Sequence, residues 1–345
     1  MRNKFSIAVV GLALVWVSST VAQSQGPPAW AYGTSSVAAP AAGAPSAASS
    51  EPPDTTLKSV PGSSLQFTRA QISNPLGPAD WFPNDHPPMP EVVAHHGQNP
   101  VARACALCHY PNGKGRSENA GIAGLPGSYF LGQLRDFRNG NRRSAEPRKA
   151  NTNTMIAIAK SMTDEEMQQA ADYYSSMKWS PWIKVVETDM APQTRLTPAG
   201  LFLSLDNGEK QPLGQRILEV PENTEAAEVL RDPHSGFIAY VPVGSIKKGE
   251  ALVSGGGGKT TPCRVCHGQD LSGLTAAPGV AGPGAVPGIA GRSPSYVVRQ
   301  LYDIQKGTRN GTSTALMKAP VANLTEEDML NIAAYLASLN VQANP

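Results

Sequence analysis

The sequence predicts a mainly α-helical protein in which one small domain occurs twice. Two long segments repeat the same order of residues, and each copy contains apolar residues at helical spacing behind a capping signal. The 33 glycines and 31 prolines among 345 residues indicate small units joined by irregular segments. With 40% apolar residues, the chain is too apolar to be wholly disordered.

The repeated segments run from about Pro90 to Lys178 and from about Ile246 to Leu339. Each contains one pentad of two cysteines and a histidine, which reads Cys105-Ala-Leu-Cys108-His109 in the first copy and Cys263-Arg-Val-Cys266-His267 in the second. Gly-Ile-Ala-Gly follows both pentads, and Met155, Thr163 and Tyr173 recur at a constant offset. Because each copy has its own motif, the repeat indicates a duplicated domain and not a solenoid.

The first 22 residues have the features of a secretory signal peptide. Arg2 and Lys4 precede a short apolar run, and Ala22 ends it at the expected cleavage site. The alternative is an uncleaved anchor, but the run is too short to span a bilayer comfortably. An exported chain fits a bacterial periplasm, and no other stretch is long and apolar enough to predict a membrane span in the mature chain.

Four further parts follow the leader. They are an Ala/Pro-rich tether and lead-in over residues 23–80, a first domain over 81–180, an inter-domain segment over 181–245 and a second domain over 246–345. The tether has too few bulky apolar residues to offset its chain entropy, and we expect it to be flexible from residue 23 to about 60. Residues 181–245 have no counterpart in either copy and predict an ordered strap with short strands.

Each domain is predicted to be helical. One helix is expected from Tyr129 to Asn139, with its counterpart from Tyr296 to Lys306. The last helix of each copy begins at a capping box, Thr163 with Glu166 and Thr325 with Asp328. An irregular loop is expected between these helices, and a short helix before each cysteine pair.

The pentads predict covalent haem. In Cys-x-x-Cys-His, both thiols add to the porphyrin and the histidine becomes the proximal iron ligand. The attachment residues would be Cys105, Cys108, Cys263 and Cys266, and the proximal ligands His109 and His267. Zinc is disfavoured because neither copy has a second ligand pair at finger spacing, and a redox dithiol because the surroundings lack a βαβ pattern.

A second axial ligand is expected downstream in each copy. Met155 and Met317 are the candidates, because the repeat alignment pairs them and both precede the capped last helix. Met162 has no sulfur counterpart in the second copy, where Leu324 stands. Met167 and Met329 do correspond, but they fall on an apolar helical stripe and are expected to pack in the core.

Polar side chains on the helix after each pentad are candidates for contacts with haem propionates. These are Tyr129, Gln133, Tyr296 and Gln300, and the alternative is an amphipathic helix with a satisfied tyrosine. A basic run follows in the first copy, comprising Arg135, Arg138, Arg142, Arg143, Arg148 and Lys149. It is expected to be a solvated face, with docking of an acidic redox partner as the sharper alternative.

Taken together, these motifs resemble the class I cytochrome c domain, and the tandem arrangement is similar to the two-haem cytochromes c of bacterial periplasms. The resemblance implies three core helices around each of two covalent c-type haems. It also implies histidine and methionine iron ligands, His109 with Met155 and His267 with Met317. The long strap and the tether depart from a plain tandem, so the inter-haem geometry does not follow from the resemblance.

The expected function is electron transfer, not catalysis. Axial positions filled by histidine and methionine leave no open iron site, which argues against a two-haem peroxidase. Expected partners are redox donors and acceptors, either membrane respiratory complexes or a dehydrogenase of which the chain is the cytochrome subunit. Two of the 29 Lys and Arg residues lie in the leader and the rest balance the 27 Asp and Glu, so nucleic-acid binding is not expected.

Overall fold

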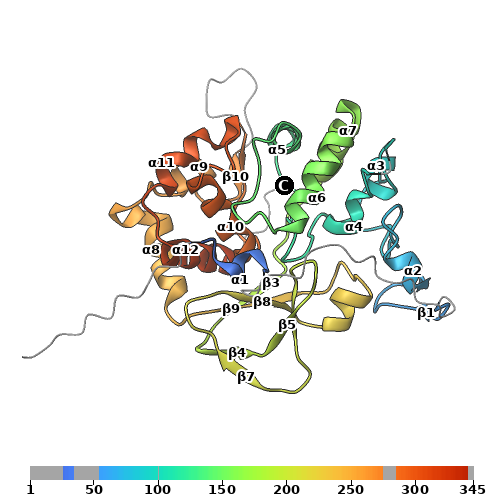
Figure 1. Cartoon of the computed structure of the whole chain (residues 1–345), viewed down its shortest axis with the longest axis horizontal. Helices are drawn as coiled ribbons and strands as arrows, with labels where there is room; N and C mark the ends of the chain where they lie inside the picture. Colours follow the sequence, from blue (N-terminus) through green and yellow to red (C-terminus); the bar gives the residue numbers. More distant parts are fainter. Residues whose placement is uncertain (1–25, 35–53, 100, 275–284, 341–345) are drawn as a thin grey trace, which may run out of the picture.

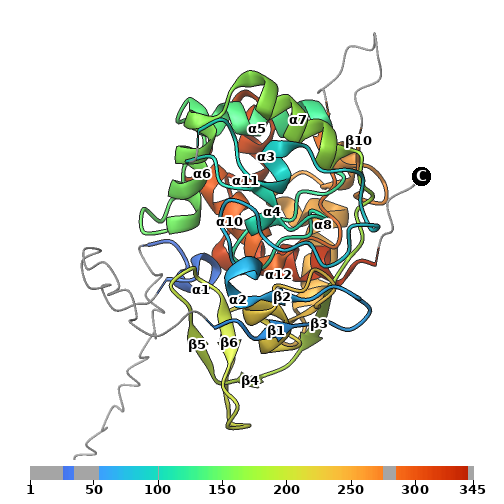
Figure 2. The same ribbon diagram turned by 90° about the vertical axis from the view of Figure 1, so that its right-hand side faces the viewer.

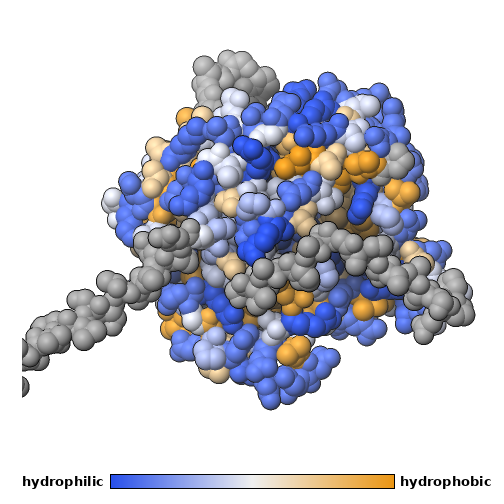
Figure 3. Space-filling model, viewed as in Figure 1, coloured by the Kyte–Doolittle hydropathy of each residue, from blue (hydrophilic) through white to orange (hydrophobic). Residues whose placement is uncertain are grey.

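The computed structural model describes residues 26–34, 54–99, 101–274 and 285–340, so the predicted signal peptide lies outside the described residues. Two helical domains lie side by side above a layer of short strands (Figure 1). In the view turned by 90° the strands again lie below the helices (Figure 2). The face shown in Figure 3 is mostly hydrophilic, with small separate apolar patches. Within the described ranges, no helix is long and apolar enough to cross a bilayer.

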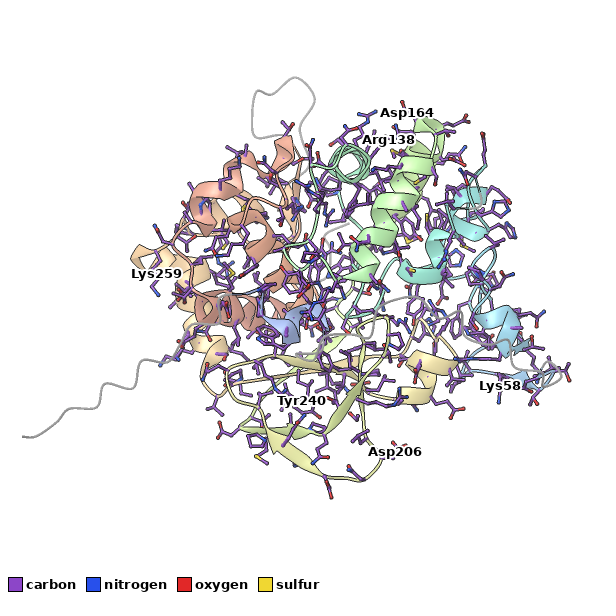
Figure 4. The ribbon with its side chains drawn as sticks, in the orientation of Figure 1. Lys58, Arg138, Asp164, Asp206, Tyr240 and Lys259 are labelled. Atoms are coloured by element: carbon purple, nitrogen blue, oxygen red, sulfur yellow. The ribbon has the colours of Figure 1, made fainter. Side chains whose placement is uncertain are left out.

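The first domain surrounds its core with short helices. In chain order they are α3 (Glu91–Ala94), α4 (Cys105–His109), α5 (Gly127–Arg138), α6 (Ala150–Ser161) and α7 (Asp164–Ser175). α5 packs against both α6 and α7 and buries Phe130 and Leu134 between them. Arg138 at the end of α5 forms an ion pair with Asp164 at the start of α7, and both are labelled at the top of Figure 4.

The second domain repeats this arrangement. Its elements are α8 (Ser245–Gly255), α9 (Arg264–His267), β10 (Gly273–Leu274), β11 (Val286–Pro287), α10 (Pro294–Gln305), a 3-10 helix (Thr312–Met317), α11 (Lys318–Val321) and α12 (Glu326–Ser338). α8 and α12 form its largest helix contact. The helices expected at Tyr129 and Tyr296 are confirmed as α5 and α10, and both capping boxes form at Thr163 and Thr325.

The segment before each last helix differs from the irregular loop that the sequence predicts. In the first domain Met155 lies inside the twelve-residue helix α6, whereas Met317 ends the 3-10 helix of the second domain. Residues 150–161 contain neither glycine nor proline and include good helix formers such as alanine and methionine. The second copy has Pro320, which is tolerated only in the first turn of a helix, and its helix is accordingly broken.

The strap of residues 181–245 folds into the strand layer. It contains β3 (Ile183–Glu187), β4 (Met190–Pro192), β5 (Thr194–Leu196), β6 (Phe202–Ser204), β7 (Lys210–Pro212), β8 (Leu218–Pro221), a π-helix (Glu225–Val229) and β9 (Phe237–Val241). β9 is central, parallel to β3 and antiparallel to β8. Its alternate residues Phe237, Ala239 and Val241 join the core of the second domain. Tyr240, labelled in Figure 4, packs against the layer's own small core.

The described part of the N-terminal segment does not behave as a tether. Residues 26–34 contain helix α1 (Ala29–Tyr32), which packs against α10 of the second domain. The Tyr32 ring is fully buried and its hydroxyl donates to Asp303 Oδ1 at 2.7 Å. The expected flexibility therefore does not hold here, because Trp30 and Tyr32 supply large apolar side chains in an otherwise Ala/Pro-rich stretch.

The lead-in of residues 54–80 is also packed. It contains β1 (Leu57–Lys58), β2 (Phe67–Thr68) and α2 (Arg69–Ile72). Trp81, just beyond it, donates from Nε1 to the carbonyl of Leu230 at 2.8 Å and forms a small core with Val60 and Ile72. The lead-in therefore attaches to the strap through these buried residues.

Candidate functional site

The two cysteine pairs lie on single helical turns. In α4, Cys105 and Cys108 are three residues apart and so lie on one side of the turn, with His109 next. Cys263 caps α9, which carries Cys266 and His267. All four thiols are free of disulfides, and burial is the largest effect that raises the pKa of Cys105 to about 12 and that of Cys263 to about 11.

The raised pKa values of Cys105 and Cys263 do not fit a redox dithiol. Such a site needs a thiolate, which is obtained by lowering a cysteine pKa. The described residues contain no group of three or more His, Cys, Asp or Glu side chains placed to hold a metal ion.

Each motif histidine is held by a backbone carbonyl. His109 Nδ1 donates to Ala120 O at 2.8 Å and His267 Nδ1 donates to Pro287 O at 2.9 Å. Both acceptors directly precede Gly-Ile-Ala-Gly, so the same contact occurs at equivalent positions within each copy of the repeat. A proton fixed on Nδ1 leaves the Nε2 lone pair free for a metal. Burial lowers the pKa of both imidazoles and favours the neutral, ligating form.

One cavity lies against the first motif. It has a volume of about 310 Å³, within the usual range of roughly 300–1,000 Å³ for cofactor sites. Cys105, Cys108 and His109 line it, and so does Met155 from α6. Met162 also lines the cavity, so a second sulfur is present in its wall. In the second domain, Cys263 and Met317 pack against the same apolar core.

The four polar residues predicted to contact propionates all line this cavity, including the two from the second domain. In the structure two arginines bind them. Arg142 donates from Nη1 to Gln133 and from Nη2 to Tyr296 and Gln300. Arg309 Nη2 donates to Tyr129 OH at 2.6 Å and to Gln133 Oε1 at 2.8 Å. All of these contacts except the one between Arg142 and Gln133 cross the domain interface. Their role toward propionates stays a prediction.

No sequence motif marks these two arginines as site residues. The basic run predicts a solvated face for Arg142, yet Arg142 is half-buried and turned toward the second domain. The signal that could have found the pair is the repeat itself, since Arg142 and Arg309 are equivalent positions. Lys149 from the same basic run is likewise buried, whereas Arg135 and Arg143 are exposed as expected.

Buried arginines lie close to residues that line the cavity. Within the part of the chain that the structure describes, Arg292, Arg299 and Arg309 are each at most 6% exposed and form no ion pair with a carboxylate. Burial also raises the pKa of Asp136 and Asp303 in this region. Such an environment suits an anionic ligand, and haem carries two propionates. The residues present therefore fit a covalently attached haem.

The comparisons with known proteins point to one family. The family model for cytochrome c matches residues 94–178 and 248–340, which together exceed half of the chain. Cytochrome c4 of Azotobacter vinelandii is 23% identical over 242 residues, covering 69% of this chain and 86% of its own length. The thiosulfate dehydrogenase electron acceptor of Thiomonas intermedia is 25% identical over 243 residues, with 69% and 80% covered.

Among solved structures, reduced cytochrome c4 from Pseudomonas stutzeri matches with a TM-score of 0.42 and 22% identity, covering 68% of this chain and 93% of that one. The family match falls on the two repeated helical segments, each of which contains one Cys-x-x-Cys-His motif. The chain therefore belongs to the cytochrome c family, with two cytochrome c domains in tandem that carry two covalent c-type haems.

Proposed function

We propose that this protein is a two-haem electron carrier whose irons are held by His109 with Met155 and by His267 with Met317. The observation that supports this most directly is the first cavity, whose wall contains an oriented imidazole and the thioether of Met155. When bound, the haem supplies one-electron chemistry at its iron. The chain's own residues would hold that group in one geometry and would supply both protein ligands to its iron.

Each residue of the motif has a separate task in this proposal. Cys105 and Cys108 would anchor the first porphyrin, and Cys263 and Cys266 the second. The carbonyls of Ala120 and Pro287 fix the imidazoles of His109 and His267, so the ligand need not reorganise when the iron changes charge. Burial of the site keeps water away and raises the cost of charge at the iron, which sets the reduction potential.

A second candidate is the electron-accepting subunit of a periplasmic dehydrogenase. Two relatives are named thiosulfate dehydrogenase electron acceptor, from Thiomonas intermedia and Stutzerimonas stutzeri, each at 25% identity. This function uses the same haem chemistry but requires a stable complex with a catalytic partner. Cross-linking in intact cells followed by mass spectrometry separates the two, because a free carrier gives several transient partners and a subunit gives one.

Export to the periplasm is part of the proposal. It is supported by the signal-peptide pattern of residues 1–22 and by the motifs for covalent haem. Cleavage after Ala22 makes Gln23 the first residue of the mature protein. The mass of the protein purified from a periplasmic extract tests this directly, since an uncleaved anchor would retain the leader.

The axial ligands are tested by replacing one sulfur at a time. The purified protein is expected to give a pyridine haemochrome with two haems per chain. Met155→Ala should remove the sulfur-to-iron charge-transfer band of one haem. Met162→Ala is the matched control, because it deletes a buried sulfur from the same cavity wall and should leave the band in place. The reverse result would assign Met162 as the ligand. A single haem per chain would refute the proposal of a two-haem carrier.

A further inference from the structure

A buried lysine in the first domain has no hydrogen-bond partner among the residues that the structure describes. Lys149 immediately precedes α6, is 4% exposed and lines the cavity beside His109 and Met155. Among the residues that the structure places, none forms a hydrogen bond with its Nζ atom. A buried ammonium without a counter-charge is strongly unfavourable, so its position calls for an anion.

A second cation enters the same cavity from the other domain. Arg299 lies on α10, is 6% exposed and also lines the cavity. Its Nη1 donates to Ala31 O at 2.6 Å and its Nη2 to Ser117 O at 2.9 Å, and both acceptors are neutral carbonyls. Helix α1 therefore helps to hold this guanidinium beside the first domain, without neutralising it.

The neighbouring acids form no ion pair with either cation among the described residues. Glu118 pairs with Arg116 at 2.6 Å, and Asp303 and Glu219 interact with the charge of Arg299 only from beyond contact distance. The pKa of Lys149 is lowered to about 7. Burial is the largest cause, and the nearby positive charge of Arg299 is the next. The two cations thus share one buried region in which neither forms an ion pair with a carboxylate of the described residues.

We propose that Lys149 and Arg299 together bind a propionate of the haem in the first domain. The first haem site would then be completed by a residue of the second domain, which helix α1 holds in position. This inference rests on the proposed function, because it needs a haem attached at Cys105 and Cys108. The inference goes beyond the proposed function, because it assigns an anion subsite to residues that no sequence motif marks.

The proposal has a measurable consequence for the reduction potential. A fixed positive charge near the haem stabilises the reduced iron, which carries one positive charge less than the oxidised iron. Removing either cation should therefore lower one midpoint potential and leave the other in place. Because Lys149 and Arg299 serve the same haem, the double variant should again displace only one midpoint, and further than either single variant.

The experiment is spectroelectrochemical titration of the full two-haem protein and of Lys149→Met. We expect the affinity of one haem for its electron to fall at least tenfold, which is about 59 mV for a one-electron couple. Lys160→Met is the matched control, since Lys160 lies on the same helix and is exposed. Arg299→Met should lower the same midpoint, and Lys149→Arg should restore it.

The outcomes separate this inference from the proposed function. Two haems with their sulfur bands intact and unchanged midpoints in Lys149→Met and Arg299→Met would overturn the propionate subsite alone. Displacement of different midpoints by the two variants would also overturn it. If Lys149→Met loses one haem while Lys149→Arg keeps both, the requirement for charge is supported. Loss of haem from both would show a packing role and overturn the proposal.

Discussion

Arg142 and Arg309 occupy equivalent positions in the two repeats and pair with each other across the domain interface. Their backbones form an isolated antiparallel bridge, which Arg143 N to Thr308 O at 2.8 Å and Asn310 N to Asn141 O at 2.7 Å extend. Each guanidinium then reaches a tyrosine of the opposite domain. The interface is thus built from two copies of one motif, so a single duplicated sequence supplies both halves of it.

The first prediction concerns this pair. Arg309→Met removes the donor to Tyr129 OH and one of the two donors to the buried Gln133 Oε1, which keeps its hydrogen bond from Arg142. The net loss of a hydrogen bond from a charged donor is about 1.5–3 kcal/mol, so the free energy of unfolding should fall by that order. Denaturant unfolding of the two-haem protein measures it.

The control for Arg309→Met is Arg143→Met. Arg143 is exposed, and its interface contact is made by the backbone amide, which a change of side chain preserves. It should stay within about 0.5 kcal/mol of the parent. Equal losses in the two variants would show that the guanidinium of Arg309 does not hold the domains together.

The second prediction concerns the contact between α8 and α12. A Cβ atom at Gly249 would overlap the carbonyl oxygen of Asn331 and lie 2.7 Å from Cβ of Tyr335. Gly249→Ala must therefore push the helices apart, and overpacking of this kind costs roughly 1–3 kcal/mol or more. Thermal unfolding should show a clearly lower midpoint for the second domain.

Gly255→Ala provides the matched control in the same helix. A Cβ atom there meets nothing within 4 Å, and alanine is the better helix former by up to about 1 kcal/mol. Its stability should equal or exceed that of the parent. A Gly249→Ala protein as stable as Gly255→Ala would mean that α8 and α12 are less closely packed than described.

The helices and caps of both domains could be predicted from the sequence because their signals are local. Thr163 with Glu166 and Thr325 with Asp328 form the two capping boxes expected from their spacing. The haem motif is also local, since five consecutive residues carry it. The number of domains and of haems follows from the duplication, without any knowledge of tertiary contacts.

What could not be predicted depends on contacts between distant segments. Lys149 and Arg135 belong to the same basic run, yet one is buried and the other exposed, because the second domain covers only part of that surface. The burial of Tyr32 depends on α10, which lies more than 260 residues further along the chain. The ligand role of Met155 stays a prediction, and the structure places this residue in helix α6 and not in the expected loop.

The last prediction concerns the dependence of stability on pH. Burial acts to lower the pKa of His86, but the hydrogen bond to Asp80 and the contact with the Pro87 carbonyl raise it further than burial lowers it. Its Nε2 lies 3.1 Å from Asp80 Oδ2 and its Nδ1 lies 2.9 Å from Pro87 O. Two acceptors favour the imidazolium, which alone can donate from both nitrogens.

A pKa that is higher in the folded state stabilises the protein below the unfolded value of about 6.5, and this contribution is lost as the pH rises through the folded pKa. Asp80→Asn should therefore reduce the free energy of unfolding most at about pH 5 and least at about pH 8. Asp206→Asn, an exposed change in the strand layer, should show no such trend. A loss for Asp80→Asn that is constant or grows with pH would exclude a charged His86–Asp80 pair.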